Sequence, residues 1–178
     1  MPATAPTINT PRLTLRAPRM TDFPAYRDAC ASDRLRYMGG PMSMRDAWGM
    51  FCRDVAQWAL LGHGGWAIED RATGATVGQI MLSRHPDFAE TELGWMVFPE
   101  GESKGIAFEA AEAARGWAYS EGAQTTLVSY IHKDNARSIA LAQRLGAAHD
   151  PGAPECPYPD HLVYRHPAPG AASRRGAA

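Results

Sequence analysis

Five consecutive residues, Ser103, Lys104, Gly105, Ile106 and Ala107, have the types and the position expected of a diphosphate-binding loop. They follow a strand-like segment and open a helical pattern, so several backbone N–H groups lie free at the positive end of a helix. The small residues at 105 and 107 let a ligand approach the backbone closely, and the lysine adds a positive charge. The segment therefore predicts a site for a pyrophosphate group.

The elements on either side of this loop have clear patterns. Thr91 to Phe98 is rich in aromatic and β-branched residues, which predicts a strand. Pro99 and Gly101 end the strand, because proline has no N–H to give to a ladder and glycine tolerates turn geometry. From about Lys104 to Ala118, apolar residues recur at helical spacing, so a long helix follows the loop.

The other hydrophobic patterns predict one sheet with helices around it. Period-two patterns predict strands at Arg12–Arg16, Gly65–Glu69, Ala75–Ser83, Thr125–Ile131 and Asp160–His166. Helical patterns with capping residues predict helices from Thr21-Asp22 to about Ser32, from about Ser43 to Leu61, and from Ala136 to Leu145. This order predicts an α+β fold with a mostly antiparallel sheet.

Length and composition favour one globular domain. The chain has 178 residues, 45% of them hydrophobic, which is enough to bury a core. We expect residues 11–167 to form a single domain. Residues 1–10 are expected to be a flexible arm and residues 168–178 a disordered tail, because both ends are rich in proline and small residues.

Charge and cysteine content exclude several classes of protein. The formal net charge is −1 with no long run of one sign, so nucleic acid is not the expected partner. The three cysteines and six histidines are scattered without disulfide or ligand spacing, so we expect no metal and a reducing compartment. With neither a signal-peptide pattern nor an apolar run long enough to span a membrane, the expected location is cytoplasmic.

Three segments resemble the Gcn5-related N-acetyltransferases (the GNAT family), and in particular the ribosomal-protein serine and alanine N-acetyltransferases. In chain order they are TPRLTLRAPRMTDFPAY, ELGWMVFPEGESKGIAFEAAEAARGWAY and LVSYIHKDNARSIALAQRLGA. The resemblance implies a GNAT-like mixed sheet, mostly antiparallel, with about six to seven strands flanked by about four helices.

The resemblance also implies an activity, namely transfer of an acetyl group from acetyl-CoA to a primary amine in a ternary complex. Acetyl-CoA is then the co-substrate, and the acceptor is a protein N-terminus or a small-molecule amine. In this family the central strand separates from its neighbour and exposes backbone groups to the pantetheine arm, which implicates Met96, Val97 and Phe98. Asn135, which suits a helix cap, is also the residue that the family uses to reach CoA.

Glu92 and Glu90 are the candidates for the general base, acting directly or through a water molecule. Both lie on one face of the predicted strand, and a carboxylate beside Trp95 would have a raised pKa. The structural alternative is a solvated strand face or a cross-strand partner. Glu92 is preferred, because the family often has an acidic residue directly before this hydrophobic-Gly-aromatic triplet.

Ser138 is the candidate for the acid that protonates the departing thiolate. On its predicted helix it shares a face with Leu141, Ala142 and Leu145, so it either bonds back to its own helix or points into the active cleft. The related ribosomal-protein enzymes have a serine here. Many other acetyltransferases use a tyrosine further along the helix, where this chain has Ala142 and Gln143.

The chain departs from the family pattern in the phosphate loop. Glu102 stands where the family usually has Gln or Arg, and Ser103 where it often has Gly. The resemblance also places the first two helices beside the acceptor, so that Tyr37 and part of the nearby group that includes Met38 and Met42 line the amine pocket.

Two other functions could use the same loop. A non-catalytic acyl-CoA-binding or sensing module would keep the phosphate site without the base. A nucleotide-binding protein would present the same free amides, but the chain lacks the G-x-x-x-x-G-K-S/T and G-x-G-x-x-G patterns. The sequence does not specify the acceptor or the oligomeric state, and a homodimer is compatible with it.

Overall fold

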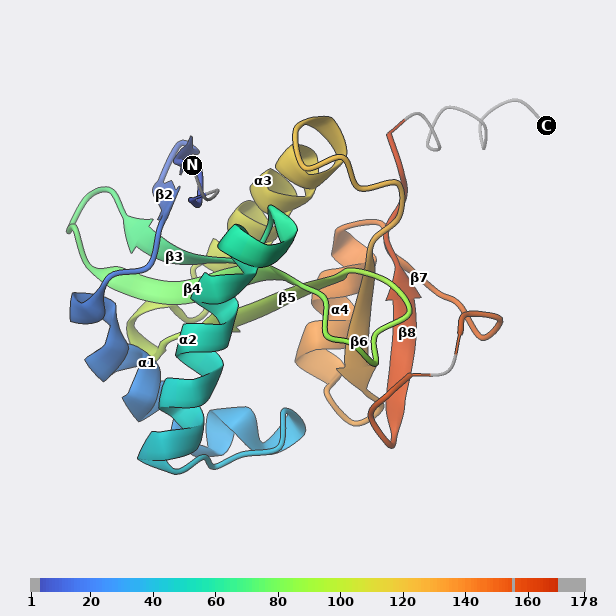
Figure 1. The fold of residues 1–178 in the computed structure, drawn as a ribbon, viewed down its shortest axis with the longest axis horizontal. Coiled ribbons are helices and arrows are strands. Elements are labelled where there is room, and N and C mark those ends of the chain that lie inside the picture. The colour runs from blue at the N-terminus through green and yellow to red at the C-terminus, as the bar shows by residue number, and fades with distance from the viewer. Residues whose placement is uncertain (1–3, 155, 170–178) are drawn as a thin grey trace.

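An eight-stranded sheet forms the centre of the fold in the computed structural model, which describes residues 4–154 and 156–169 (Figure 1). The strands are β1 (Ile8–Asn9), β2 (Leu13–Arg16), β3 (Gly65–Asp70), β4 (Thr76–Ser83), β5 (Glu92–Val97), β6 (Val128–His132), β7 (Ala148–His149) and β8 (His161–Arg165). Their order across the sheet is β1-β2-β3-β4-β5-β6-β8-β7. Every neighbouring pair is antiparallel except β5 and β6, which are parallel.

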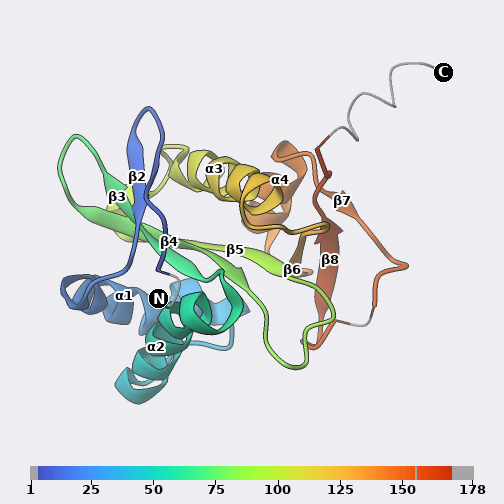
Figure 2. The same ribbon diagram turned by 45° about the horizontal axis from the view of Figure 1, so that its top comes forward.

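Helices cover both faces of this sheet. The four α-helices of the described chain are α1 (Phe23–Cys30), α2 (Met44–Leu61), α3 (Ile106–Ser120) and α4 (Ala136–Arg144). Short 3-10 helices occupy η1 (Met20–Asp22), η2 (Asp33–Tyr37) and η3 (Pro99–Gly101). α1 and α2 lie on one face of the sheet, and α3 and α4 lie on the other (Figure 2).

The predicted α+β architecture is confirmed, but the sheet has more strands than expected. β1 and β7 are two residues each, which is too short to produce a period-two pattern in the sequence. The strand predicted from Thr125 begins only at Val128. Residues 170–178 of the predicted tail lie outside the described residues.

Capping residues fix the ends of the helices that flank the site. The hydroxyl of Ser43 accepts a hydrogen bond from the N–H of Asp46 at 3.2 Å, so α2 begins where the sequence indicates. Gly62 ends α2 in a left-handed conformation with φ 74°. Asn135 caps α4, because its side-chain oxygen accepts from the N–H of Ser138 at 3.2 Å.

Asp22 does not cap α1 as predicted. It ends η1, and its carboxylate accepts the N–H of Arg19 at 2.7 Å and two hydrogen bonds from Arg16 at 2.9 Å. The Asp22 carboxylate therefore caps the start of η1, one turn before α1. α1 itself begins at Phe23 with a proline in its first turn.

α3 packs closely on the sheet through a row of small residues. Four of its alanines are completely buried, and β4 and β5 lie directly beneath them. The four are Ala110, Ala111, Ala114 and Ala118. Because these side chains are short, the helix approaches the sheet and brings its N-terminus to the end of β5.

The segment before β2 is attached to the fold, although the sequence suggested a flexible arm there. β1 pairs with β2, and Trp66 donates its indole N–H to the carbonyl of Pro6 at 2.8 Å. The hydroxyl of Thr10 donates to the carboxylate of Glu109 on α3 at 2.6 Å. The expectation of a loose arm is therefore wrong for residues 6–10, because these contacts are made to distant parts of the chain.

β5 and β6 separate after a single backbone pair. Six residue pairs join β4 to β5, whereas β5 pairs with β6 only at Glu92 and Val128. Beyond that pair the hydroxyl of Ser129 donates to the carbonyl of Leu93 at 2.6 Å, and the two strands diverge (Figures 1 and 2). The rest of β5 is left with an open edge on this side.

Replacing Thr10 by valine should lower the free energy of unfolding by about 1–2 kcal/mol, because it leaves partly buried hydrogen-bonding groups without partners. The hydroxyl donates to Glu109 and also accepts from the N–H of Leu13 at 2.9 Å. Urea denaturation measures the loss. Thr7→Val is the matched control, since Thr7 is exposed and forms no side-chain hydrogen bond within the described residues. Equal effects of the two substitutions would contradict the attachment through Thr10.

Candidate active site

Two pockets open on the gap between β5 and β6. The first has a volume of about 440 Å³ and lies between η2, the loop before α3 and the start of α4. The second has a volume of about 430 Å³ and lies between η2, α2 and strands β4 to β6. The pockets share the lining residues Arg36, Tyr37, Met38, Trp95, Asn135 and Ser138. Two ligands in these pockets would therefore meet beside Trp95 and Ser138.

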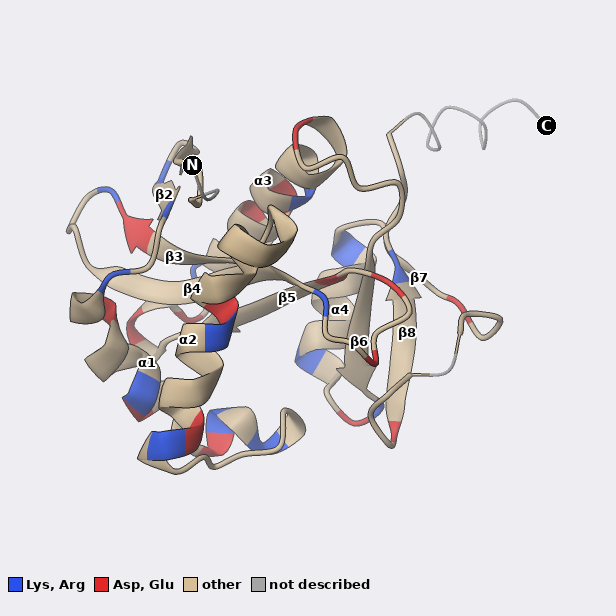
Figure 3. Ribbon diagram, in the orientation of Figure 1, with Lys and Arg blue, Asp and Glu red and all other residues tan. Residues whose placement is uncertain are grey.

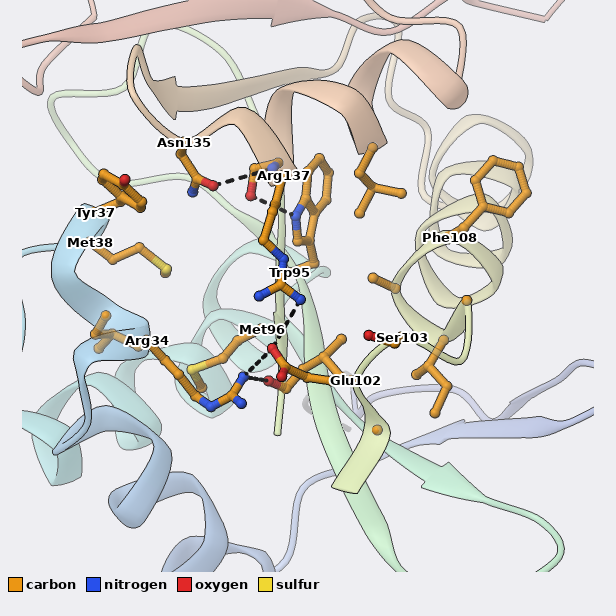
Figure 4. A pocket seen from close by; sticks show the side chains of 18 of the residues that line it. Arg34, Tyr37, Met38, Trp95, Met96, Glu102, Ser103, Phe108, Asn135 and Arg137 are labelled. Carbon is orange, nitrogen blue, oxygen red and sulfur yellow. Dashed lines mark hydrogen bonds and ion pairs between the residues drawn. The ribbon is translucent and has the colours of Figure 1, made fainter. Parts of the chain in front are cut away.

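The loop before α3, with Glu102 and Ser103 labelled in Figure 4, lines the first pocket. Within the described part of the chain, the N–H groups of residues 103–108 have no hydrogen-bond acceptor. Ser103 and Gly105 have left-handed backbones with φ 58° and 76°, a type of turn that gathers N–H groups into a concavity. With the N-terminus of α3 behind it, this loop can hold an anion.

Of the five loop residues predicted to bind the co-substrate, four line the first pocket. These are Ser103, Gly105, Ile106 and Ala107. The side chain of Lys104 lies elsewhere, because its ammonium donates to the carbonyl of Glu100 at 2.7 Å. Lys104 therefore offers the site its backbone N–H and not its positive charge.

Two of the arginines that line the first pocket lie on either side of Glu102 (Figure 4). One carboxylate oxygen of Glu102 is 2.7 Å from Nη1 of Arg34 and 3.0 Å from Nη2 of Arg137. The hydrogen bond from Arg34 and then that from Arg137 lower the pKa of Glu102 to about 2. Since the three residues belong to η2, the loop and α4, this ionised bridge crosses the pocket.

The open edge of β5 presents the backbone groups of alternate residues. In the antiparallel pairing with β4, Phe98 donates its N–H to the carbonyl of Val77 at 2.8 Å, so Met96 also faces β4. The backbone groups of Trp95 and Val97 then face the gap. The carbonyl of Val97 is bonded there by the guanidinium of Arg34 at 3.3 Å.

This alternation changes the set of residues predicted for the pantetheine arm. Val97 faces the gap with its backbone, while Met96 lines the first pocket through other atoms. Phe98 is placed away from the pocket, since its side chain is buried against α1 and α2 and its N–H and C=O are both bonded. The backbone groups of Trp95 face the gap instead, because only alternate residues of a strand point their polar groups to the same side.

Glu92 lines the second pocket at the point where β5 and β6 still touch. Burial raises the pKa of its carboxyl from 4.5 to about 7. Hydrogen bonds from the backbone of Tyr130 and from the hydroxyl of Ser83, the latter at 3.3 Å, lower the pKa but offset only part of the effect of burial. At neutral pH this group can therefore take up or release a proton.

Glu90, the other predicted candidate for the base, is held outside both pockets. Its carboxylate accepts hydrogen bonds from Arg165 on β8 at 2.6 and 2.9 Å and from the hydroxyl of Thr126 at 3.0 Å. The Arg165 guanidinium lowers the pKa of Glu90 below its ordinary value. The two glutamates do not share a strand face, because β5 begins only at Glu92 and Glu90 turns toward β8.

Gly94 leaves space beside the carboxyl group of Glu92. Both residues point to the same face of β5, and a Cβ at position 94 would lie 3.9 Å from Cδ of Glu92 and 3.4 Å from Cγ of Met81. The missing side chain therefore makes room for a small group next to the carboxylate.

Ser138 points into the gap and does not bond back to its helix within the described residues. Its hydroxyl oxygen accepts the indole N–H of Trp95 at 3.3 Å, which leaves the hydroxyl hydrogen free to donate. Asn135 lines both pockets while its side-chain oxygen caps α4. Both of these predicted residues thus lie where the two pockets meet.

Among the charged pocket residues that sequence reasoning missed are Arg34, Arg137 and Asp54. Arg34 and Arg137 lie in or beside segments that were considered for other reasons, and no local pattern distinguishes them from solvent-exposed arginines. Asp54 is buried on α2 and lines the second pocket, and burial raises its pKa to about 6. Its partner is the side-chain amide of Gln79 at 2.9 Å, a contact between distant strands and helices that periodicity cannot reveal.

The described residues contain no cluster of three or more histidine, cysteine, aspartate or glutamate side chains that could hold a metal ion. No helix among them combines the length and the hydropathy that crossing a bilayer requires. Acidic and basic residues are mixed over both halves of the fold (Figure 3).

Comparison with known proteins assigns a family to this architecture. Residues 12–148 match the family model described as an acetyltransferase (GNAT) domain. The chain is also similar to the crystal structure of an acetyltransferase from Agrobacterium tumefaciens str. C58, with 46% sequence identity and a TM-score of 0.88. That match covers 92% of this chain and 95% of the other.

More distant structures share the fold at low sequence identity. The spermidine N-acetyltransferase from Vibrio cholerae, in complex with CoA and spermine, is 15% identical with a TM-score of 0.68, over 88% of this chain and 94% of that one. The ribosomal-protein-S5-alanine acetyltransferase from Vibrio fischeri is also 15% identical, with a TM-score of 0.67 over 93% and 98%. At these identities the likeness concerns the fold alone.

Replacing Glu92 by glutamine should stabilise the protein above pH 7 and have little effect near pH 4. The folded protein raises the pKa of Glu92 from 4.5 to about 7, so ionisation favours the unfolded chain as the pH rises between these values. The difference in Tm between variant and wild type therefore grows across this interval and is constant above it. Thermal melts in a series of buffers measure the difference.

Glu90→Gln is the matched control with the opposite sign. Arg165 lowers the pKa of Glu90, so its ionised form stabilises the fold at neutral pH and this contribution is lost as the pH falls. The substitution should destabilise the protein at pH 7 and matter less in acid. The same pH dependence for both variants would contradict the different environments of the two carboxylates.

Proposed function

This chain belongs to the GNAT acetyltransferase family, and from that premise we propose that it transfers the acetyl group of acetyl-CoA to a primary amine in one ternary complex. The observation that carries the proposal is the meeting of two pockets at Trp95 and Ser138. One pocket has free amides for a diphosphate, and the other has a carboxyl group that titrates near neutrality. Direct transfer requires both substrates to reach one point at the same time.

The first pocket is the proposed site for acetyl-CoA. The free amides of residues 103–108 and the helix dipole behind them suit its diphosphate. Arg34 and Arg137 lie at the same place, and with the ionised Glu102 between them they leave one net positive charge. The open edge of β5, at Trp95 and Val97, can bond the amide groups of the pantetheine arm as a strand partner would. The thioester then lies near Ser138.

The second pocket is the proposed site for the amine, with Glu92 as the general base. A primary amine arrives as an ammonium ion, because its pKa is about 10, and it must lose a proton before it can attack. Glu92 can accept that proton, since burial has brought its pKa to about 7. The free space beside Gly94 supports this assignment, since it leaves room for the nitrogen next to the carboxylate.

The reaction needs two further groups in the gap, namely a donor for the negative oxygen and an acid for the departing thiolate. The amine nitrogen forms a bond to the thioester carbon, and a free backbone N–H on β5 stabilises the negative oxygen of the tetrahedral intermediate. The C–S bond then breaks as the electron pair of the negative oxygen re-forms the carbonyl, and the nitrogen loses its second proton to solvent. The thiolate takes a proton from the hydroxyl of Ser138, which regains one from solvent, so that one proton is released overall. Trp95 bonds the oxygen of this hydroxyl and so directs its hydrogen away from the indole.

A catalytic role of Glu92 predicts a rate that rises with pH and levels off above about pH 7, where the carboxylate is ionised. Glu92→Gln should lower kcat about a hundredfold or more and remove this inflection, because the general base is lost. Release of CoA thiol from acetyl-CoA in the presence of a panel of amines measures the rate.

Ser138→Ala is the informative comparison for the Glu92 variant. It should lower kcat but keep the inflection near pH 7, since the base remains. Both variants should bind acetyl-CoA as the wild type does. Unchanged turnover in Glu92→Gln would reject the base assignment, and binding without turnover in the wild type would favour a non-catalytic acyl-CoA-binding module.

Glu102→Gln should tighten acetyl-CoA binding by about three- to tenfold at low salt, because it removes a negative charge next to the diphosphate and releases two arginines. Calorimetric titration at two salt concentrations measures the gain, which should shrink as salt rises. Glu100→Gln is the control, since Glu100 is exposed and forms no ion pair within the described residues. Weaker binding by Glu102→Gln would show that the carboxylate holds the arginines in a productive position.

A further inference from the structure

We infer that the acceptor is a compact primary amine with one positive charge on an apolar body, and that polyamines and polypeptide N-termini are poor substrates. This inference rests on the proposed function, because it assigns the second pocket to the acceptor. It follows from the walls of that pocket, from its mouth and from the charges available inside it.

The walls of the second pocket are mainly apolar. Its deep part is formed by buried or half-buried side chains, which are Met50, Met81, Leu93, Trp95, Tyr130 and Ile131. A volume of about 430 Å³ lies in the range of small-molecule sites. A ligand that fills this space gains most from an apolar body, since a polar one would lose its water without finding partners.

Contacts between η2 and the C-terminal half narrow the mouth of this pocket. A ring nitrogen of His161, at the start of β8, lies 3.2 Å from the carbonyl oxygen of Tyr37 in η2. The Tyr37 ring also packs on His132 of β6 with centroids 5.1 Å apart. A small molecule can pass beside such contacts, whereas a polypeptide must keep a continuous exit for the chain behind its N-terminus.

The two carboxylates of the second pocket that can face an ammonium group lie close together. Glu92 serves the reacting amine, and Asp54 is near enough for its charge to raise the pKa of Glu92. One oxygen of Asp54 accepts from Gln79 at 2.9 Å and Tyr26 at 3.4 Å, and its other oxygen is buried without a partner, so both carboxylates serve the same end of a ligand. Asp160 lines the pocket, but its charge is neutralised by Lys133 at 2.6 Å.

Positive charge at the mouth would repel a second ammonium group. Arg36 and Arg53 are both exposed and both line the second pocket. Arg36 lies over the Tyr37 ring at 4.8 Å, and Arg53 forms no ion pair within the described residues. A diamine that places one nitrogen beside Glu92 would bring the other toward these guanidinium groups, where like charges disfavour binding.

The test compares hexylamine with hexamethylenediamine, which has the same length and a second ammonium group, and with alanyl-tyrosyl-serine amide as a peptide. Release of CoA thiol is measured with the full chain at saturating acetyl-CoA. We expect kcat/KM for hexylamine to exceed that of the other two by about tenfold or more, a preference of about 1.4 kcal/mol.

A charge reversal at the mouth tests the reason for the preference. Arg53→Glu should narrow the ratio between hexylamine and hexamethylenediamine to about threefold or less, because the repulsion becomes attraction. Arg45→Glu, an exposed position on the same helix that does not line the second pocket, should keep the wild-type ratio. Thermal melts verify that both variants are folded.

The outcomes separate this inference from the proposed function. If the diamine or the peptide is acetylated as well as hexylamine or better, transfer to amines stands and the inference about the acceptor is overturned. An unchanged ratio of kcat/KM between hexylamine and hexamethylenediamine in Arg53→Glu would also overturn the inference, since the charge at the mouth would then not discriminate between the two amines. If no amine releases CoA thiol, the proposed function itself fails, and the inference with it.

Discussion

The separation of β5 from β6 is the constraint on which the rest of the site depends. Six backbone pairs hold β5 to β4, but a single pair joins it to β6, and both pockets open where the pairing stops. Unpaired strand groups are costly when they are buried, so side chains take over part of the lost pairing. Ser129 bonds the carbonyl of Leu93, and Arg34 bonds that of Val97. The gap is thus a stable part of the fold that keeps a strand edge free for a ligand.

Opposite environments give three glutamates of one segment different chemistry. Glu90 is paired with Arg165 and Glu102 with Arg34, and in both cases the arginine lowers the pKa of the carboxyl. Glu92 has no such partner, and burial raises its pKa to about 7. The groups whose pKa is lowered stay ionised and organise the structure around them, whereas only Glu92 can exchange a proton near neutral pH.

The sequence predicted most of the elements and the loop with free amides at Ser103 to Ala107, because these depend on neighbouring residues. Pro99, Gly101 and the small residues after them mark the change from strand to helix, and the loop amides are indeed free of internal acceptors within the described chain. β1 and β7 were missed because two-residue strands carry no period. The prediction that the backbone of Phe98 faces the gap was wrong. The register between β4 and β5 decides which residues of β5 turn their backbone groups toward the gap, and this register is a contact between separate strands.

Residue types and local spacing therefore determined the family resemblance, the order of elements, the loop from Ser103 to Ala107 and the position of Ser138 on its helix. Only the tertiary structure decided which glutamate is desolvated, because Arg165 lies 75 residues from Glu90 in the chain. It also decided that Arg34 and Arg137 meet at Glu102. Arg34 and Glu102 are 68 residues apart in the chain. Charge pairing and burial depend on distances in space, and hydrophobic periodicity carries no information about them.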